Sequence, residues 1–462
     1  MATTPYFVLS PNLILSTIGL LHGPDKTVPT PVEDWREATV GVVIPALNEE
    51  KNIVFCLDAL FNQTIKPKKI ILVDDGSKDR TVQFAREFCE LHNVDILIIQ
   101  RDHPIGKTPT LKRQAREFDY DVEFILDADT ILESENYIER TVEELYKAVG
   151  ISSVCGMVLP VRDKDRITWY ENERIKKYFD VYGEKDFLLK QDFFHKHMRK
   201  ISSIYRDVLY SFLEKFIYHG QMVFFGSITN PVGCAVAYRR KYLKDLFDTY
   251  EPILGDDLTN SEDIFIGFAM LNHGYRNVQI IDVHARSQEP EYEKLPRQIY
   301  LWSSSFFQSC YYFPDLVLTP VKSFRSYLHH RKMQKKEAEI IKQKRKVQEP
   351  YRQPFGDEYT KKYGRPMGWA IFTSLIEKVF FPLILLLMIL LGWWEALLIT
   401  LVAEATISIG ILVYINKGQR WKYLWKGIIA TPFRYISLMT DLFVFVKFLI
   451  DVYILKDRRW RK

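Results

Sequence analysis

Apolar residues between positions 38 and 129 follow two periods in turn, one typical of strands and one typical of helices. Short β-branched runs predict strands, and apolar positions three and four residues apart predict helices. The expected strands are Val40–Ile44, Ile70–Val73, Val94–Ile99 and Glu123–Leu126, and the expected helices between them are Glu49–Phe61 and Thr81–Leu91. This alternation predicts an α/β fold built on a parallel sheet.

A different pattern, apolar at nearly every position, extends from Val379 to Ile415. It is broken at Gly392–Glu395, which divides it into two spans of roughly 17–20 residues, each long enough to cross a bilayer. The alternative is a buried helical pair in a soluble protein, but helices in soluble proteins are seldom apolar all round. The sequence therefore predicts a membrane hairpin with an aromatic turn at the interface.

A third apolar segment, Ile428–Leu455, also contains the ionisable residues Arg434, Asp441, Lys447 and Asp451. Charges are costly in lipid, so this segment is expected either to span at a tilt or to lie in the membrane interface. Basic residues favour the cytosolic side for both the loop 417–426 and the tail 456–462, and one crossing cannot satisfy both. The topology of this segment therefore stays open.

These patterns divide the chain into four parts. Residues 1–37 are an N-terminal segment whose apolar stretch, Phe7–Leu21, is too short and lacks the basic flank of a cleaved signal. Residues 38–320 are the α/β domain, with a charged and aromatic insertion at about 162–225. Residues 321–366 are a basic juxtamembrane linker, interpreted as a solvated segment or as a contact for anionic lipid head groups, and its position just before the hairpin favours the lipid contact. Residues 367–462 form the transmembrane region.

The net charge and the cysteines of the chain give no support to several classes of function. The chain has 462 residues, a formal net charge of +5 and five cysteines. This small net charge gives no reason to expect nucleic-acid binding. The cysteines are widely spaced and form no Cys-x-x-Cys pair of the kind that indicates a zinc or redox site. We therefore expect an integral protein of the plasma or inner membrane whose main domain faces the reducing cytoplasm.

Acidic residues directly follow two of the expected strands, in Asp74-Asp75-Gly76-Ser77 and in Asp127-Ala128-Asp129. Ligands of parallel α/β sheets bind beyond the carboxyl ends of the strands, so chemistry is expected here. An Asp-x-Asp is an oxygen-rich site suited to Mg²⁺ or Mn²⁺. Two carboxylates at a strand end also occur in ordinary turns, so this motif alone is weak evidence.

Five elements in order resemble the family-2 glycosyltransferases over roughly Val40 to Phe307. They are Ile44–Glu50 (IPALNEE), Val73–Asp79 (VDDGSKD), Gly106-Lys107, Asp127–Asp129 (DAD) and Ser261–Asp263 (SED). The resemblance implies a GT-A, Rossmann-like fold and a nucleotide-sugar donor, expected to be a UDP-sugar. By the same resemblance Asp75 binds the nucleotide base, and Asp127 with Asp129 holds the metal and the diphosphate. Asp74 is interpreted as a turn residue.

The resemblance also assigns the remaining donor residues and the base. Pro45, Ala46, Glu49 and Lys107 fall on the donor side. Asp263 matches the family's general base, because displacement at the anomeric carbon needs a proton acceptor for the attacking hydroxyl. A second acidic pair, Asp256-Asp257, is interpreted as loop acids.

The segment Arg297–Phe307 is similar to the Q-x-x-R-W motif of hyaluronan, chitin and cellulose synthases. Gln298 and Trp302 match it, but Leu301 stands where these enzymes have the arginine that contacts the donor diphosphate. Arg297 is expected to substitute as a donor-binding residue. Trp302 is expected to stack on the acceptor, or else to anchor the protein at the membrane surface.

The run Val232–Arg240 resembles the family's acceptor-side strand. It places Gly233 and Cys234 at the acceptor, and Gly233 is expected to allow its close approach. A small core residue is the simpler interpretation of the Cys234 thiol.

Together the resemblances imply an inverting, metal-dependent transfer of sugar from a nucleotide diphosphate to a growing polysaccharide at the membrane. Two alternatives stay open. One is a single transfer to a lipid such as a polyprenyl phosphate or ceramide, and the other is an inactive scaffold with this fold. The expected cofactor is Mg²⁺ or Mn²⁺, and the expected partners are the donor, a polysaccharide or lipid acceptor and the membrane.

Overall fold

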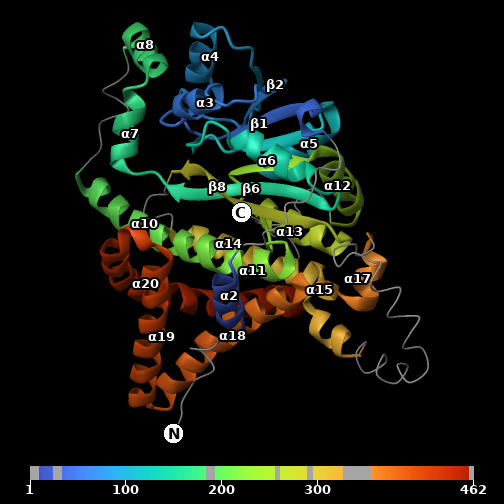
Figure 1. The fold of residues 1–462 in the computed structure, drawn as a ribbon, viewed down its shortest axis with the longest axis vertical. Helices are drawn as coiled ribbons and strands as arrows, with labels where there is room; N and C mark the ends of the chain where they lie inside the picture. The colour runs from blue at the N-terminus through green and yellow to red at the C-terminus, as the bar shows by residue number, and fades with distance from the viewer. Residues whose placement is uncertain are drawn as a thin grey trace.

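The fold is given by a computed structural model that describes residues 10–23, 34–183, 193–254, 261–288, 295–325 and 355–456. Most of the predicted basic linker, the pair Asp256-Asp257 and the tail beyond residue 456 lie outside these ranges. Figure 1 shows the sheet and its helices in one half of the molecule, and the C-terminal helices in the other.

One mixed sheet of eight strands, in the order β3-β2-β1-β4-β7-β6-β8-β5, forms the core of the α/β region. Its strands are β1 Val40–Ala46, β2 Lys69–Asp74, β3 Leu97–Gln100, β4 Val122–Leu126, β5 Thr130–Leu132, β6 Ile151–Pro160, β7 Ala235–Arg239 and β8 Arg276–Ser287. The first four strands are mutually parallel, as the sequence predicted. Strands outside that predicted region make the sheet mixed, because β7 pairs antiparallel with β4 and β6, and β5 with β8.

Alternate residues of the strands face two separate hydrophobic clusters, as the period of two requires. Val42 and Ile44 face the first cluster, and Val43 faces the second. The first cluster is covered by α3 Ile53–Phe61, α4 Thr81–Leu91, α6 Tyr137–Tyr146 and α8 Glu173–Tyr182. The second is covered by α5 Lys107–Glu117, α12 Arg240–Leu254, α13 Glu262–His273 and α14 Leu295–Tyr312. Because each face is covered by helices, the central strands β1, β4 and β7 are buried on both sides.

The predicted helix Glu49–Phe61 begins later than expected, at Ile53. The chain before it forms turns, in which the Glu49 backbone N–H donates to Thr81 Oγ1 at 2.8 Å. Glu49 thus belongs to a loop at the carboxyl edge of the sheet.

The expected insertion is helical; its first two helices lie at the side of the sheet near α3 and α4, and its later helices lie between the sheet and the C-terminal helices (Figure 1). It comprises α7 Asp163–Tyr170, α8, α10 Phe193–Phe212, a π-helical turn Leu213–Tyr218 and α11 His219–Phe225. Shorter elements elsewhere are a 3₁₀ turn Trp35–Glu37, α15 Pro314–Val317 and α17 Asp357–Tyr363.

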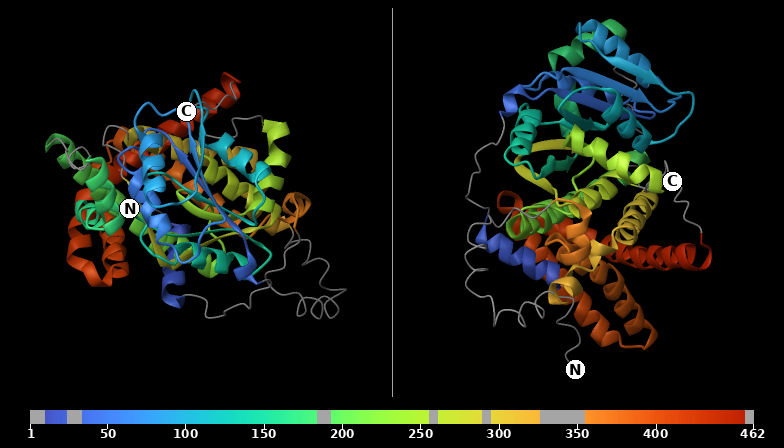
Figure 2. Two further views of the ribbon diagram at one scale, coloured as in Figure 1. Left: turned by 90° about the horizontal axis from the view of Figure 1, so that it is seen from above. Right: turned by 90° about the vertical axis from the view of Figure 1, so that its right-hand side faces the viewer.

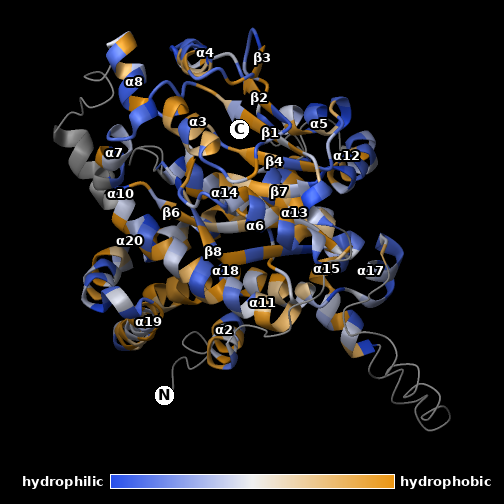
Figure 3. Ribbon diagram, turned by 45° about the horizontal axis from the view of Figure 1, so that its top comes forward, coloured by the Kyte–Doolittle hydropathy of each residue, from blue (hydrophilic) through white to orange (hydrophobic). Residues whose placement is uncertain are grey.

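Two C-terminal helices form the predicted hairpin. Among the described residues, α18 Met367–Leu390 and α19 Trp394–Ile415 are the two helices long and apolar enough to cross a membrane. Figure 2 shows the hairpin projecting from the end of the molecule away from β1 and β2, and Figure 3 shows its mostly hydrophobic composition. The third segment is α20 Arg420–Leu449 with a π-helical turn Ile450–Ile454; it contacts α14, α18 and α19.

The N-terminal helix α2 Pro11–His22 packs against helices from much later in the chain. Gly19 and Gly220 make this crossing possible, because a Cβ on Gly220 would lie 2.6 Å from the Cα of Ser16. Asn12 donates to Ser374 Oγ and to Glu377 Oε2 of α18, both at 3.0 Å. The helix is therefore tied both to α11 and to the hairpin.

Candidate active site

The donor-side residues predicted from the sequence gather at one edge of the sheet. Ala46, the last residue of β1, is in register with Asp74 of β2. Pro45 lies beside it in the same strand, and the backbone N–H of Asp75 donates to the carbonyl of Ala46 at 2.8 Å. The carboxyl ends of these strands thus meet, as expected for parallel neighbours.

Asp75 and Asp74 accept hydrogen bonds from different parts of the chain. Asp75 accepts hydrogen bonds from Arg101 at 2.8 Å and from the backbone N–H groups of Ile105 and Gly106 at 2.9 and 2.8 Å. Asp74 accepts from the backbone N–H of Ser77 at 3.2 Å, which agrees with its interpretation as a turn residue. Asp75 therefore fixes the loop that leads into α5.

Lys107, the first residue of α5, joins two acidic segments. Its Nζ lies 2.7 Å from Oδ1 of Asp127 and 2.9 Å from Oε1 of Glu262, and it donates to the carbonyl of Gly233 at 3.0 Å. Burial disfavours the charged amine, but the two carboxylates outweigh this and hold the pKa of Lys107 well above its usual value. One ammonium group thus brings the Asp127–Asp129 motif next to the Ser261–Asp263 segment.

The carboxyl groups of Glu49, Asp127 and Asp129 lie at this edge and repel one another. Burial and the charge of Asp127 raise the pKa of Asp129 to about 6. Burial and the charge of Asp129 raise the pKa of Glu49 to about 8. A cluster of this kind is typical of a site that binds a cation, because added positive charge relieves the repulsion.

The carboxylates at this edge fit a metal ion that is bound by the protein and by a ligand together. Among the described residues, no group of three His, Cys, Asp or Glu side chains is arranged to hold a metal ion by itself. Magnesium is commonly held by one or two carboxylates together with substrate phosphates. Asp127 and Asp129 therefore fit an ion that the diphosphate of a donor helps to bind.

Asp263 lies in the first turn of α13, in a half-buried and closely packed position. It accepts a hydrogen bond from the Ser261 hydroxyl and another from the backbone N–H of Ile264, the latter at 2.8 Å. Burial and the neighbouring Glu262 raise its pKa to about 6. An aspartate with this pKa is suited to accept a proton near neutral pH.

Gly233 packs directly against Asp263. A Cβ at position 233 would lie 2.7 Å from the Cβ of Asp263 and 3.1 Å from its Oδ2. The sequence predicted that the acceptor approaches closely at Gly233. In the structure, the space beside the Gly233 Cα is occupied by the side chain of Asp263. The neighbouring Cys234 is partly exposed, so it is not a wholly buried core residue, and its carbonyl accepts from the N–H of Asp127 at 2.8 Å.

We expect Gly233→Ala to lower turnover at least tenfold while nucleotide affinity changes little, because the added methyl must displace Asp263. The comparison is kcat beside UDP affinity measured by calorimetry. A Gly410→Ala variant provides the control, since a Cβ there meets no atom within 4 Å. Parent-like turnover of Gly233→Ala would contradict the packing argument.

Gln298 and Trp302 of α14 both contact a residue that the sequence analysis did not identify as functional. Arg206 of α10 donates to Oε1 of Gln298, and its guanidinium carbon lies 4.9 Å from the centre of the Trp302 ring. Arg297, the expected substitute for the missing motif arginine, is exposed. No local pattern in the insertion distinguishes Arg206 from its other basic residues, so sequence reasoning missed it.

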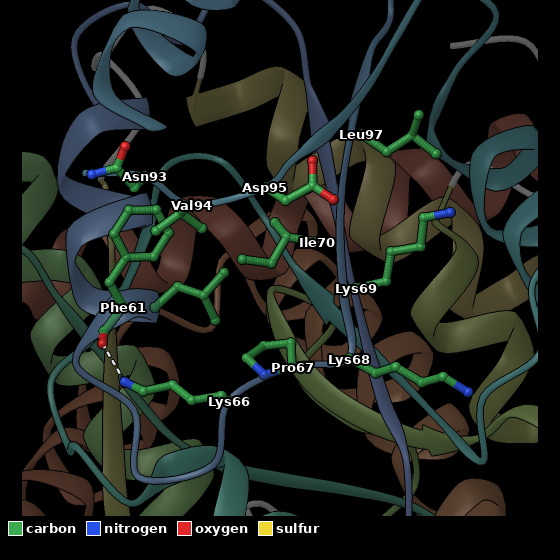
Figure 4. A pocket seen from close by; sticks show the side chains of 11 residues that line it. Phe61, Lys66, Pro67, Lys68, Lys69, Ile70, Asn93, Val94, Asp95 and Leu97 are labelled. Carbon is green, nitrogen blue, oxygen red and sulfur yellow. Dashed lines mark hydrogen bonds between the residues drawn. The ribbon is translucent and has the colours of Figure 1, made fainter. Parts of the chain in front are cut away.

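A cavity of about 360 Å³ lies at the opposite edge of the sheet (Figure 4). It is formed at the amino ends of β2 and β3, with Lys66, Lys68 and Lys69 around it. Lys66 donates to the carbonyl of Phe61 at 2.6 Å, and Lys69 lies over the Phe118 ring. These contacts and the position of the cavity separate it from the acidic edge.

Comparisons with known proteins find similar sequences and structures. Residues 41–247 match Glycosyl transferase family 2. An O-antigen chain rhamnosyltransferase of Salmonella typhimurium is 36% identical over 27% of this chain and 38% of its own length. A chondroitin synthase of Escherichia coli is 33% identical over 26% of this chain and 17% of its own length. The chain thus spans less than half the length of these two relatives.

A solved mannosyltransferase of Pyrobaculum calidifontis, in complex with GDP-Man and Mn²⁺, is similar to the whole chain. The two are 14% identical with a TM-score of 0.49, over 96% of this chain and 95% of that one. The family match covers β1 to β7 and the Asp127–Asp129 motif. Residues 41–247, slightly less than half of the chain, therefore resemble a family-2 glycosyltransferase domain, and they contain most of the strands of the mixed α/β sheet.

Proposed function

We propose that this protein transfers one sugar from a nucleotide-diphosphate donor to an acceptor held at a membrane surface. The proposal rests on the two ion pairs of Lys107, whose ammonium lies between Asp127 and Glu262. Glu262 directly precedes Asp263 in the chain. Lys107 brings the carboxylates expected to bind the donor and the carboxylate expected to act as base into one site. An inactive scaffold has no need of such a cluster of partly buried charge, which is costly to fold.

The reaction follows from the roles of these residues. Asp263 accepts the proton of the acceptor hydroxyl while the oxygen forms its bond to the anomeric carbon. The bond between that carbon and the diphosphate breaks at the same time, and the nucleotide diphosphate leaves with the electron pair. A single displacement of this kind inverts the anomeric centre.

Asp127 and Asp129 are the residues that would hold Mg²⁺ or Mn²⁺, and the metal supplies positive charge to the departing diphosphate. Lys107 compensates further negative charge as a point cation. Asp75, Pro45, Ala46 and Glu49 lie along the edge where the nucleotide is expected, and UDP is the nucleotide that the sequence resemblance favours.

The proposed base gives a pH dependence. Asp263 must be ionised to accept a proton, and its pKa is raised to about 6. We therefore expect kcat to be constant above this pH and to fall about tenfold per pH unit below it. In an active Asp263→Glu variant, the pH below which kcat falls should differ from that of the parent protein. A flat kcat profile down to pH 4.5, measured with saturating donor on protein that stays folded, would contradict the assignment.

The membrane half of the proposal rests on the apolar hairpin. Large hydrophobic side chains near its turn are exposed, among them Leu390, Trp393, Trp394 and Leu398. Exposed apolar surface of this kind marks a membrane or protein contact. We place the catalytic domain on the cytoplasmic side, where the five unpaired thiols suit a reducing compartment. Release of the full chain from membranes by alkaline carbonate would contradict integral attachment.

The division into residues 1–37, 38–320, 321–366 and 367–462 is retained as part of the proposal. The described part of the chain offers two candidate spans, and two helices are too few to enclose a channel for a growing polymer. This favours a single transfer to a lipid acceptor, such as a polyprenyl phosphate, over polymer extension. The chondroitin synthase match is what supports the polysaccharide alternative.

One experiment separates these functions. Membranes containing the full chain are supplied with a panel of UDP- and GDP-sugars, and the lipid and polymer products are analysed by mass. A lipid carrying one sugar supports the proposal, and a ladder of lengthening chains overturns the single-transfer part. If no nucleotide sugar is consumed, with or without acceptor lipid, the enzymatic proposal itself fails.

A further inference from the structure

The helix α20 has an exposed apolar face that extends along its length. Large hydrophobic side chains recur on this face at the spacing of whole helical turns, and each is at least 45% exposed. They are Trp421, Trp425, Ile429, Ile436, Phe443 and, in the turn after the helix, Tyr453. The residues buried on the opposite face include Tyr423, Ala430, Asp441 and Phe448. An apolar stripe of this length marks a surface that lipid or another protein covers.

Three charged side chains of α20 are paired inside the protein, away from the apolar stripe. Their ion pairs join α20 to three other helices, namely Lys426 to Asp207 of α10, Arg434 to Glu404 of α19 and Asp441 to Lys378 of α18. Asp441 also accepts a hydrogen bond from the hydroxyl of Ser303, the residue after Trp302 on α14. Lipid can therefore cover the stripe without contacting these charges, which would be costly in hydrocarbon.

Both ends of α20 contact helices that rest on the catalytic half of the molecule. Near its start, Lys426 pairs with Asp207 of α10, which packs on β6. Near its end, the centre of the Phe448 ring lies 6.1 Å from that of Phe307 and 6.3 Å from that of Tyr311 in α14, which packs on α13. The helix between Lys426 and Phe448 is about 33 Å long, enough to cross the hydrocarbon core of a bilayer. A crossing would carry one end away from the catalytic half, so these contacts favour a helix that lies parallel to the membrane.

The direction of α20 agrees with this. In the right-hand view of Figure 2, the red C-terminal part of the chain runs across the direction in which the hairpin projects. A parallel helix also resolves the topology that the sequence left open. The basic loop 417–426 and the basic tail 456–462 can both stay on the cytosolic side, because no crossing separates them.

We infer that α20 lies in the interface of the bilayer on the side of the catalytic domain, with its apolar stripe in the lipid and its opposite face against α10 and α14. The inference rests on the proposed membrane attachment, because the hairpin directly before α20 must enter the same bilayer. Trp421 and Trp425, with basic residues beside them, suit the head-group region, where aromatic rings and positive charges are both favoured.

The test measures how deep α20 lies when the full chain is reconstituted in liposomes of phosphatidylcholine and phosphatidylglycerol. A nitroxide is attached in turn to Trp421→Cys, Ile436→Cys, Phe443→Cys and Tyr453→Cys, and its collisions with oxygen and with a water-soluble nickel chelate report the depth. These variants are made in a Cys234→Ser background, because the other four cysteines are buried. The background protein alone shows how much label the buried thiols take up.

Three further labels serve as controls. Leu387→Cys and Leu398→Cys lie on exposed positions of the hairpin and should read the hydrocarbon core. Asp95→Cys lies on an exposed position of the catalytic half and should read water. We expect the four labels on α20 to lie at one shallow depth, within about one helical turn, or 5 Å, of one another.

Other outcomes overturn the inference. A depth that increases from Trp421 to the bilayer centre and decreases again towards Tyr453 shows that α20 crosses the membrane. Labels on α20 that read water show that the stripe does not contact lipid, and labels shielded from both reagents show that protein, such as a second copy of the chain, covers it. If the labels at Leu387 and Leu398 read water as well, the proposed membrane attachment itself fails.

Discussion

Replacement of Asp263 by asparagine is expected to lower kcat by two to four orders of magnitude, with nucleotide affinity nearly unchanged. Asparagine keeps the shape of the side chain and one acceptor oxygen, so the hydrogen bond from the Ile264 N–H is retained. What is lost is the basic oxygen that takes the proton, and a positioned general base contributes about 10²–10⁴ in rate. The measurements are steady-state turnover and UDP affinity by calorimetry.

The matched control is Asp95→Asn, the same chemical change at an exposed residue beside the cavity of Figure 4. It should leave both quantities at parent values. If Asp263→Asn instead retained a substantial part of the parent turnover, the base would have to be reassigned to Asp256 or Asp257, the acidic pair outside the described residues.

Replacement of Asp129 by alanine is expected to weaken nucleotide and metal binding together, each by at least tenfold, or about 1.4 kcal/mol. Asp129 is half-buried beside Asp127 and Glu49, so its loss removes negative charge that the metal would neutralise. Without the metal, the diphosphate meets the remaining carboxylates with less compensation.

Titrations of UDP with Mn²⁺ and with EDTA provide the measurement, on the parent and on Asp129→Ala. In the parent the chelator should abolish most of the affinity, whereas in the variant it should change little. Equal UDP affinity of the parent with and without metal would show that the metal assignment is wrong. Asp95→Ala serves as the control for loss of an exposed carboxylate.

Much of the sheet and its acidic edge was predictable, because both depend on local sequence. The helix Thr81–Leu91 was predicted with the bounds that the structure has, and the strands at Ile70 and Glu123 were placed within one residue. The motifs at Asp75 and Asp127 followed these strands directly. Local pattern also predicted the apolar hairpin.

What could not be predicted depends on contacts between distant segments. The antiparallel insertion of β7 between β4 and β6 is a matter of topology, and no periodicity in Ala235–Arg239 encodes its direction. The salt bridge between Lys107 and Glu262 joins residues more than a hundred positions apart. Likewise Arg206 meets Gln298 across 92 positions, so its place beside the motif emerges only in three dimensions.

The packing of α2 sets an order of events during synthesis. Asn12 and its partner Glu377 are separated by 365 residues, which at about 5–20 residues per second corresponds to roughly 20–70 s of translation. Throughout that interval Asn12 has been made while the α18 residues that bind it have not. Among the helices that the structure describes, α2 is therefore the earliest to be made, and it gains its α18 contacts only when the hairpin emerges.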